Sequence, residues 1–128
     1  MSAAGGENVP IILLIDAEVI ARGAVASYLR ECGYQVMETN TQEDGKKLLD
    51  DTPSAFDIVI CATTGSSSGS HLEFVRWVRD HHAHVRVLVA ASVAKTARLA
   101  QDICDEGPHL RRPYEHHSLV DWIKRLRK

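Results

Sequence analysis

Short apolar runs alternate with amphipathic stretches along the chain. The runs are rich in branched residues, and they end at polar or small residues, a pattern typical of strands buried on both faces of a parallel sheet. We expect five such strands, at residues 9–15, 34–37, 56–62, 85–91 and 109–111. The first run stops abruptly at Asp16, so a polar side chain directly follows the first buried strand.

Apolar residues recur at spacings of three and four between these runs, which favours helices with one buried face. The first helix covers 18–32 and ends at Gly33, and a second starts from a cap at Thr41 and ends before Pro53. Leu72, Val75 and Val78 mark the buried face of a third. The remaining helices cover 95–104 and 115–127.

This repeated alternation of strand and helix predicts a three-layer, doubly wound α/β fold with a five-stranded parallel sheet. We expect residues 1–8 to form a flexible N-terminus and residues 9–128 to form a single domain. In such folds, ligands and reactants bind beyond the carboxyl ends of the strands. The residues to examine therefore lie at 16–18, 62–70, 90–92 and 111–113.

Composition narrows the function classes. A chain of 128 residues with 45% apolar residues and a net charge of −2 is an ordinary globular domain, without the charge of a nucleic-acid-binding one. No signal peptide or membrane-spanning run precedes the first strand, so we expect a cytoplasmic protein without membrane contact. The cysteines Cys32, Cys61 and Cys104 lack metal or redox spacing, so we interpret them as reduced, buried thiols.

Four stretches at the strand ends carry a further signal: IILLIDAE, FDIVICA, VRVLVAAS and HLRRPY. Together with the order of elements they make residues 9–126 similar to the receiver domains of bacterial response regulators. The resemblance implies a (βα)5 flavodoxin-like fold with strand order 2-1-3-4-5. It also implies a cis bond before Pro113, which an X-Pro bond permits at modest cost.

Most of the phosphorylation site that the resemblance implies is missing. Asp16 matches the first of the family's acidic pair, but Ala17 stands at the second place, a magnesium ligand in the family. Ala62 stands at the phosphoacceptor aspartate, Ala90 at the conserved hydroxyl, and Arg112 at the lysine. An alanine offers neither a metal-binding oxygen nor a carboxylate that could form an acyl phosphate. The remnant of the site is then Asp16, Glu18, Arg112 and Pro113.

We therefore expect an atypical, non-catalytic receiver domain that needs no cofactor and no metal. It would act in signal transduction by phosphorylation-independent binding of a protein partner or of a second copy of itself. By resemblance, the surface used is the face formed by the fourth helix, fifth strand and fifth helix. The candidate surface residues are Lys95, Arg98, His109, Arg111 and Tyr114, with Trp77 as a separate aromatic candidate.

Two other functions stay open at this point. The first is a conventional phosphorelay receiver whose third strand matches the family pattern in a shifted alignment, with Cys61 or Thr63 at the acceptor position. Asp57 lies too far from the end of that strand to accept the phosphoryl group. The second is an anion or nucleotide sensor using the loop at 63–70, since hydroxyls and amides before a helix can hold a phosphate. The loop candidates are Thr63, Thr64, Gly65, Ser66, Ser67 and Ser68.

Overall fold

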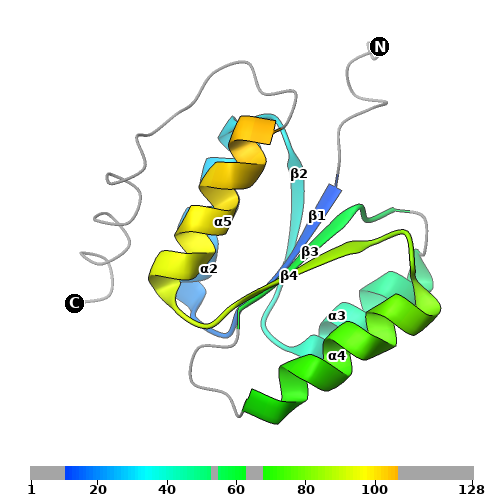
Figure 1. The fold of residues 1–128 in the computed structure, drawn as a ribbon. Coiled ribbons are helices and arrows are strands. Elements are labelled where there is room, and N and C mark those ends of the chain that lie inside the picture. The colour runs from blue at the N-terminus through cyan, green and yellow to red at the C-terminus, as the bar shows by residue number, and fades with distance from the viewer. Residues whose placement is uncertain (1–10, 53–54, 63–67, 107–128) are drawn as a thin grey trace, which may run out of the picture.

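The computed structural model describes residues 11–52, 55–62 and 68–106. Strands and helices alternate throughout these residues (Figure 1). The elements are β1 (Ile11–Ile15), α2 (Val19–Glu31), β2 (Gln35–Thr39), α3 (Gln42–Asp51), β3 (Ile58–Ala62), α4 (Ser68–His81), β4 (Arg86–Ala90) and α5 (Val93–Glu106).

The strands form one parallel sheet in the order β2-β1-β3-β4. Helices α2 and α5 cover one face of this sheet, and α3 and α4 cover the other (Figure 1). The doubly wound prediction and the order of its first four strands are therefore confirmed. The strand expected at 109–111, the helix expected at 115–127 and the bond before Pro113 lie outside the described residues.

The alternation of side chains along each strand divides the core into two clusters. On β1, Ile12 and Leu14 pack with α2 and α5, while Leu13 and Ile15 pack with α3 and α4. The same alternation holds along β3, so these two central strands are buried on both faces. We refer to the two sides as the α2–α5 layer and the α3–α4 layer.

Two helix ends follow the predicted signals. Gly33 has a φ of 106°, a backbone conformation that glycine adopts without strain, and it ends the turn after α2. At the start of α3, the Thr41 hydroxyl accepts a hydrogen bond of 3.1 Å from the Asp44 amide. Both the glycine stop and the threonine cap are confirmed.

The expected buried face of α4 is partly wrong. Leu72 is 62% exposed, whereas Phe74 is 1% exposed and Val78 is fully buried. The helix starts at Ser68, so this residue does not belong to the loop in which we expected it. Phe74 and Val78 are four residues apart on one side of the helix, and Leu72 is carried away from the core.

The interpretation of all three cysteines as reduced thiols is also wrong. Cys32 and Cys104, which are 72 residues apart in sequence, form a disulfide with a Cα–Cα distance of 5.7 Å. Cys61 is a free, buried thiol. Sequence spacing could not reveal the pair, because the fold of α2 against α5 is what brings the two side chains together.

Candidate functional site at the carboxyl ends of the strands

The sheet register places three chain segments of the candidate site side by side. Ile15 on β1 is the register partner of Cys61 on β3, and Ala62 is the partner of Ala90 on β4. Asp16 follows Ile15 directly, so it leaves β1 at the same edge of the sheet. The structure therefore brings the strand-end residues together as the parallel-sheet rule predicts.

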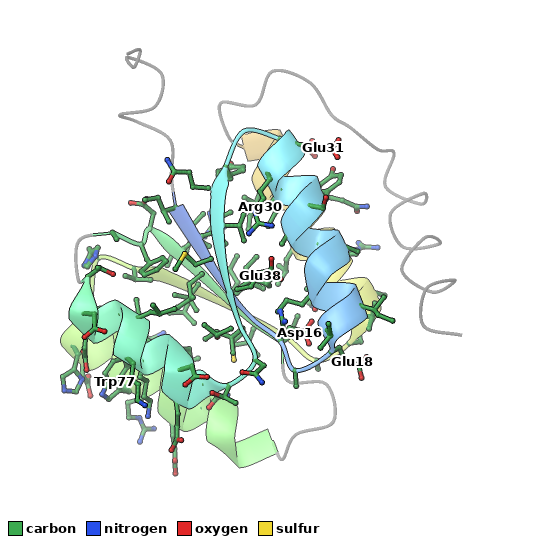
Figure 2. The ribbon with its side chains drawn as sticks, turned by 180° about the vertical axis from the view of Figure 1, so that it is seen from behind. Asp16, Glu18, Arg30, Glu31, Glu38 and Trp77 are labelled. Carbon is green, nitrogen blue, oxygen red and sulfur yellow. A yellow bond between two sulfur atoms is a disulfide. The ribbon has the colours of Figure 1, made fainter. Side chains whose placement is uncertain are left out.

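Asp16 is the charged residue at the centre of this edge. It is only 3% exposed, and its Oδ1 accepts a hydrogen bond of 2.9 Å from the Glu18 amide. Its own amide donates to the Thr39 carbonyl at 3.0 Å, which ties the end of β1 to the end of β2. Ala17 is exposed and Glu18 is half-buried, next to the start of α2 (Figure 2). The carboxylate of Asp16 is thus held in place by the turn that follows β1.

A charged network that sequence reasoning missed supports this turn. The Arg22 Nη1 donates to the Asp16 carbonyl at 2.8 Å, and the Arg22 Nε lies 3.2 Å from the Glu38 Oε1. The Arg30 Nη1 lies 3.2 Å from the other oxygen of Glu38, between α2 and β2 (Figure 2). The only sequence signal was a glutamate near the end of the second strand and arginines on the preceding helix. Arg22 positions the Asp16 backbone and does not itself offer a reactive group.

The alanines leave little chemistry at the other two strand ends. Ala62 is half-buried and Ala90 is fully buried, and neither side chain has a polar atom. The next hydroxyl along the chain is that of Ser92, and it accepts a hydrogen bond of 3.1 Å from the Lys95 amide at the start of α5. Within the described ranges, no group of three or more His, Cys, Asp or Glu residues could hold a metal ion.

Cys61 lies one residue before Ala62 and faces the α3–α4 layer. Its Sγ accepts a hydrogen bond of 3.4 Å from the Gln42 amide group. Burial raises the pKa of the Cys61 thiol, the Gln42 hydrogen bond lowers it, and the charge of Asp16 raises it further. The thiol is therefore held in its neutral form, which is the poor nucleophile of the two.

Asp57 lies at the amino ends of the strands, opposite to the candidate site, as expected. Its side chain is exposed, and its Oδ2 accepts a hydrogen bond of 2.9 Å from the Ile11 amide. Its amide donates to the Ile11 carbonyl at 2.9 Å. Asp57 therefore joins the amino ends of β1 and β3 and does not reach the candidate site.

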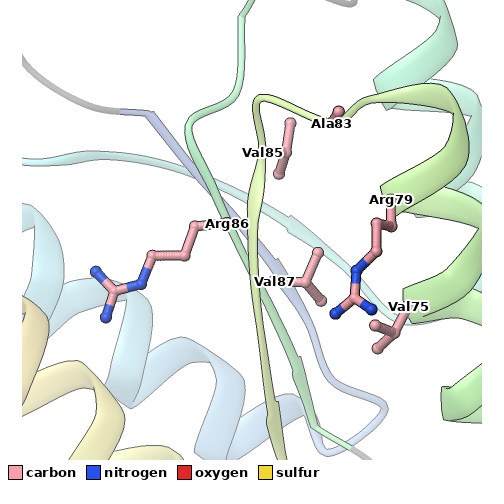
Figure 3. A pocket seen from close by; sticks show the side chains of 6 residues that line it. All are labelled: Val75, Arg79, Ala83, Val85, Arg86 and Val87. Atoms are coloured by element: carbon pink, nitrogen blue, oxygen red, sulfur yellow. The ribbon is translucent and has the colours of Figure 1, made fainter.

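A pocket of about 240 Å³ lies beside β4, away from the strand ends discussed above. Its lining residues are Val75, Arg79, Ala83, Val85, Arg86 and Val87 (Figure 3). The side chains of Arg79 and Arg86 extend on opposite sides of β4 (Figure 3). β4 is the edge strand of the described sheet, and in the predicted strand order the fifth strand lies beside it. We therefore do not assign the pocket to a ligand.

The predicted partner residues fall into two separate places. Lys95 and Arg98 are exposed on α5, in the α2–α5 layer. Trp77 is half-buried on α4 in the other layer (Figure 2), where it stacks on His81 with ring centroids 5.1 Å apart. The Lys46 ammonium lies 5.3 Å from the Trp77 ring. The structure does not place Trp77 on one surface with the α5 cations.

The other predicted site residues lie outside the part of the chain that the structure describes. These are Thr63, Thr64, Gly65, Ser66, Ser67, His109, Arg111, Arg112, Pro113 and Tyr114. Their roles stay predictions. In the described part, no helix is long and apolar enough to cross a membrane.

Comparisons with known proteins agree with this geometry. No protein-family model matches the chain, and no curated protein does. Among solved structures, a response regulator receiver domain protein from Clostridium thermocellum matches with a TM-score of 0.57 and 23% identity, covering 91% of this chain and 93% of that one. An orphan response regulator of H. pylori matches with a TM-score of 0.55 and 21% identity, covering 92% and 93%.

A third match is an atypical orphan response regulator described as having a phosphorylation-independent regulatory mechanism. It is 25% identical, with a TM-score of 0.55, and the match covers 91% of this chain and 95% of that one. All three structures are similar to this chain over nearly its whole length. The chain has the flavodoxin-like fold of response regulator receiver domains.

Proposed function

We propose that this chain is an atypical receiver domain that signals through protein contacts and not through phosphoryl transfer. The single observation behind the proposal is that Ala62 and Ala90 are register partners beside Asp16, at the edge where a receiver needs its acceptor and its hydroxyl. A phosphoryl group needs a nucleophilic oxygen to bond to, and neither alanine has one.

The magnesium ion that assists phosphorylation in receivers does not fit these residues either. Magnesium prefers an octahedron of oxygen ligands, usually with one or two carboxylates. Asp16 supplies one carboxylate, and its Oδ1 already accepts the Glu18 amide at 2.9 Å. Ala17 adds no ligand. The similar atypical orphan regulator, described as phosphorylation-independent, supports the same interpretation for this chain.

The binding surface that we propose includes the exposed cations Lys95 and Arg98 on α5. Positive charge at these two positions, in the first half of α5, favours a partner with acidic side chains and speeds its association. The partner is a protein or a second copy of this chain. The domain has no catalytic role in this proposal.

Intact-mass measurement with acetyl phosphate and magnesium tests the central claim. We expect no phosphoryl adduct on this chain, while a conventional receiver in the same mixture gains one. An adduct on this chain would contradict the proposal and favour an ordinary phosphorelay receiver. Peptide mapping would then locate the residue that carries it.

Restoring the two carboxylates tests the position of the site. The double variant A17D/A62D should bind magnesium measurably more tightly than the parent, because it brings two further carboxylates beside Asp16. The variant A83D adds one carboxylate at an exposed position before β4 and should not do so. Equal magnesium binding by both variants would show that the strand ends are not a latent receiver site.

Charge reversal tests the proposed surface. The variant K95E/R98E should weaken self-association, measured by sedimentation equilibrium, or weaken binding to an acidic partner protein. Lys47 is exposed on α3 in the other layer, so K47E serves as the control. If K47E weakened binding as much as K95E/R98E, net charge and not the α5 surface would be responsible.

A further inference from the structure

The disulfide joins the ends of the two helices that cover one face of the sheet. Cys32 is the C-cap residue of α2, and Cys104 lies in the last turn of α5. Both residues are fully buried in the cluster between these helices and the sheet. The bond therefore fixes the end of α5 to the end of α2.

A hydrogen bond next to the disulfide holds the same turn of α5. The Tyr34 hydroxyl donates to the Ile103 carbonyl at 2.6 Å, and Tyr34 is 5% exposed. The carbonyls in the last turn of a helix lack partners within the helix, so this contact satisfies one of them. Without the disulfide, this hydrogen bond and the apolar packing of Ile103 would still contribute to holding the end of α5.

We propose that Cys32 and Cys104 are a reversible thiol–disulfide site, which reacts with small-molecule thiols and disulfides of the glutathione class. In this proposal the redox state of the pair sets how firmly the last turn of α5 is attached to α2. The site goes beyond the proposed signalling function and does not depend on it. Only its effect on partner binding rests on that function, because Lys95 and Arg98 lie on the same helix.

The chemistry balances as two exchange steps. The Cys104 thiolate attacks one sulfur of glutathione disulfide, forms a mixed disulfide and releases one glutathione thiolate. The Cys32 thiolate then attacks the Cys104 sulfur and releases the second. Two protein thiols are oxidised, one glutathione disulfide is reduced to two thiols, and the two thiol protons pass to the released thiolates. Reduction runs through the same steps in reverse.

The third cysteine is kept out of this exchange by the sheet. Cys61 lies on β3 and faces the α3–α4 layer, while the disulfide lies in the α2–α5 layer. The backbone of the sheet separates the two, so Cys61 cannot attack the disulfide without loss of the fold. Cys61 therefore provides an internal reference for thiol counting.

Burial of both sulfurs means that a reagent can reach them only when the end of α5 opens. Helix ends open more readily than a whole domain unfolds. The rate of exchange should thus follow local opening of the last turn of α5. Removing the Tyr34 hydroxyl should speed that opening.

Equilibration in buffers of reduced and oxidised glutathione, followed by acid quench, alkylation in denaturant and intact mass, tests the redox site. We expect the count of alkylated cysteines to change from three to one as the proportion of oxidised glutathione rises, with Cys61 as the remaining thiol. The variant C32A/C104A should show one at every ratio. A count that stays at one or at three for wild type across all ratios would overturn the proposal.

The rate of reduction by glutathione tests the opening step. The variant Y34F should be reduced on the order of tenfold faster than wild type. The variant V78A weakens the buried core of the other layer and should leave the rate near that of wild type. Equal acceleration by both variants would mean that exchange needs global unfolding, and would exclude a local switch.

Hydrogen exchange with mass spectrometry tests the structural consequence. Reduction should speed exchange of the amides at 101–106 on the order of tenfold and leave those at 76–81 at the end of α4 unchanged. Equal exchange in both redox states would overturn the link between the disulfide and α5. Partner binding measured in the two states then reports separately on the proposed signalling function.

Discussion

The two layers of helices differ in what holds them to the sheet. In the α2–α5 layer, a disulfide joins the helices, Tyr34 bonds to Ile103, and Glu38 pairs with both Arg22 and Arg30. In the α3–α4 layer, Asp50 of α3 lies 3.1 Å from His82, the residue after α4, and the Lys46 ammonium of α3 lies 5.3 Å from the Trp77 ring of α4. Among the described residues, the helices of the α2–α5 layer are therefore joined by a disulfide, whereas no disulfide joins the helices of the α3–α4 layer.

Exposed apolar side chains occur in both layers, since Val19 and Ile20 on α2 are 66% and 48% exposed. Leu72 is 62% exposed, and the buried Nδ1 of His82 has no hydrogen-bond partner among the described residues. Trp77 on α4 stacks on His81 of the same helix, packs against the core cluster, and has the Lys46 ammonium of α3 5.3 Å from its ring. We infer that the disulfide keeps the end of α5 in a defined place, as the binding surface that we propose on this helix requires.

Reduction of the disulfide should produce the largest effect on stability. Closing a loop between residues 72 apart stabilises the folded state by about 4 kcal/mol, because it restricts the unfolded chain. Urea denaturation with and without a reductant measures the loss. The variant C32A/C104A should not respond to the reductant, and a wild type that lost nothing on reduction would remove the main difference between the layers.

Truncation of Phe74 should produce the next largest effect. This side chain is 1% exposed in the α3–α4 cluster, so F74A should cost about 3 kcal/mol through lost burial and the cavity that it leaves. Leu72 lies two residues earlier and is mostly exposed, so L72A should change stability by less than about 0.5 kcal/mol. If urea denaturation showed equal losses of unfolding free energy for F74A and L72A, Leu72 would have to be buried in the core.

The difference between Leu72 and Phe74 shows where sequence reasoning reached its limit. Buried strands were predictable because continuous apolar runs need cover on both faces, and Gly33 and Thr41 act through their own backbone and side chain. The start of α4 had no such local signal, since its first turn is built from serine and glycine. The spacing of Leu72, Val75 and Val78 selected one face, but Phe74 shares the buried face with Val78, so the exposed Leu72 was wrongly placed in the core.

The candidate site shows the same limit in another form. The strand ends near Asp16, Ala62 and Ala90 were predictable because parallel strands end at one edge. The Arg22–Glu38–Arg30 network and the Cys32–Cys104 disulfide were not, because each joins residues whose distance depends on how α2 packs. Contacts within an element can be predicted from spacing, but contacts between elements need the fold.

A pair of helical glycines compares the packing of the two layers directly. A Cβ at Gly23 in α2 would meet nothing within 4 Å, so G23A should stabilise the protein by about 0.5–1 kcal/mol through higher helix propensity. A Cβ at Gly45 in α3 would lie 2.6 Å from the Ile15 Cδ1 and 3.2 Å from its Cγ1. Ile15 is 2% exposed and has little room to move, so G45A should destabilise by about 1 kcal/mol. Thermal unfolding of both variants measures the difference. A gain in stability from G45A would mean that Ile15 in the α3–α4 layer moves at little cost to admit the new methyl group.

The thiol of Cys61 should produce the smallest effect, and only at alkaline pH. Burial first, and then the charge of Asp16, raise the pKa of this thiol, and these causes outweigh the opposing hydrogen bond from Gln42. Since the folded state disfavours the thiolate, the unfolded chain ionises first as pH rises. The stability from Cys61 is thus fully present below the ordinary thiol pKa of about 8.5 and is lost as pH rises from there through the folded pKa. We expect unfolding free energies from pH 7 to 10 to fall more steeply for C32A/C104A than for the triple variant that adds C61A. Parallel curves would mean that the α3–α4 layer admits enough water around Cys61 to solvate its thiolate.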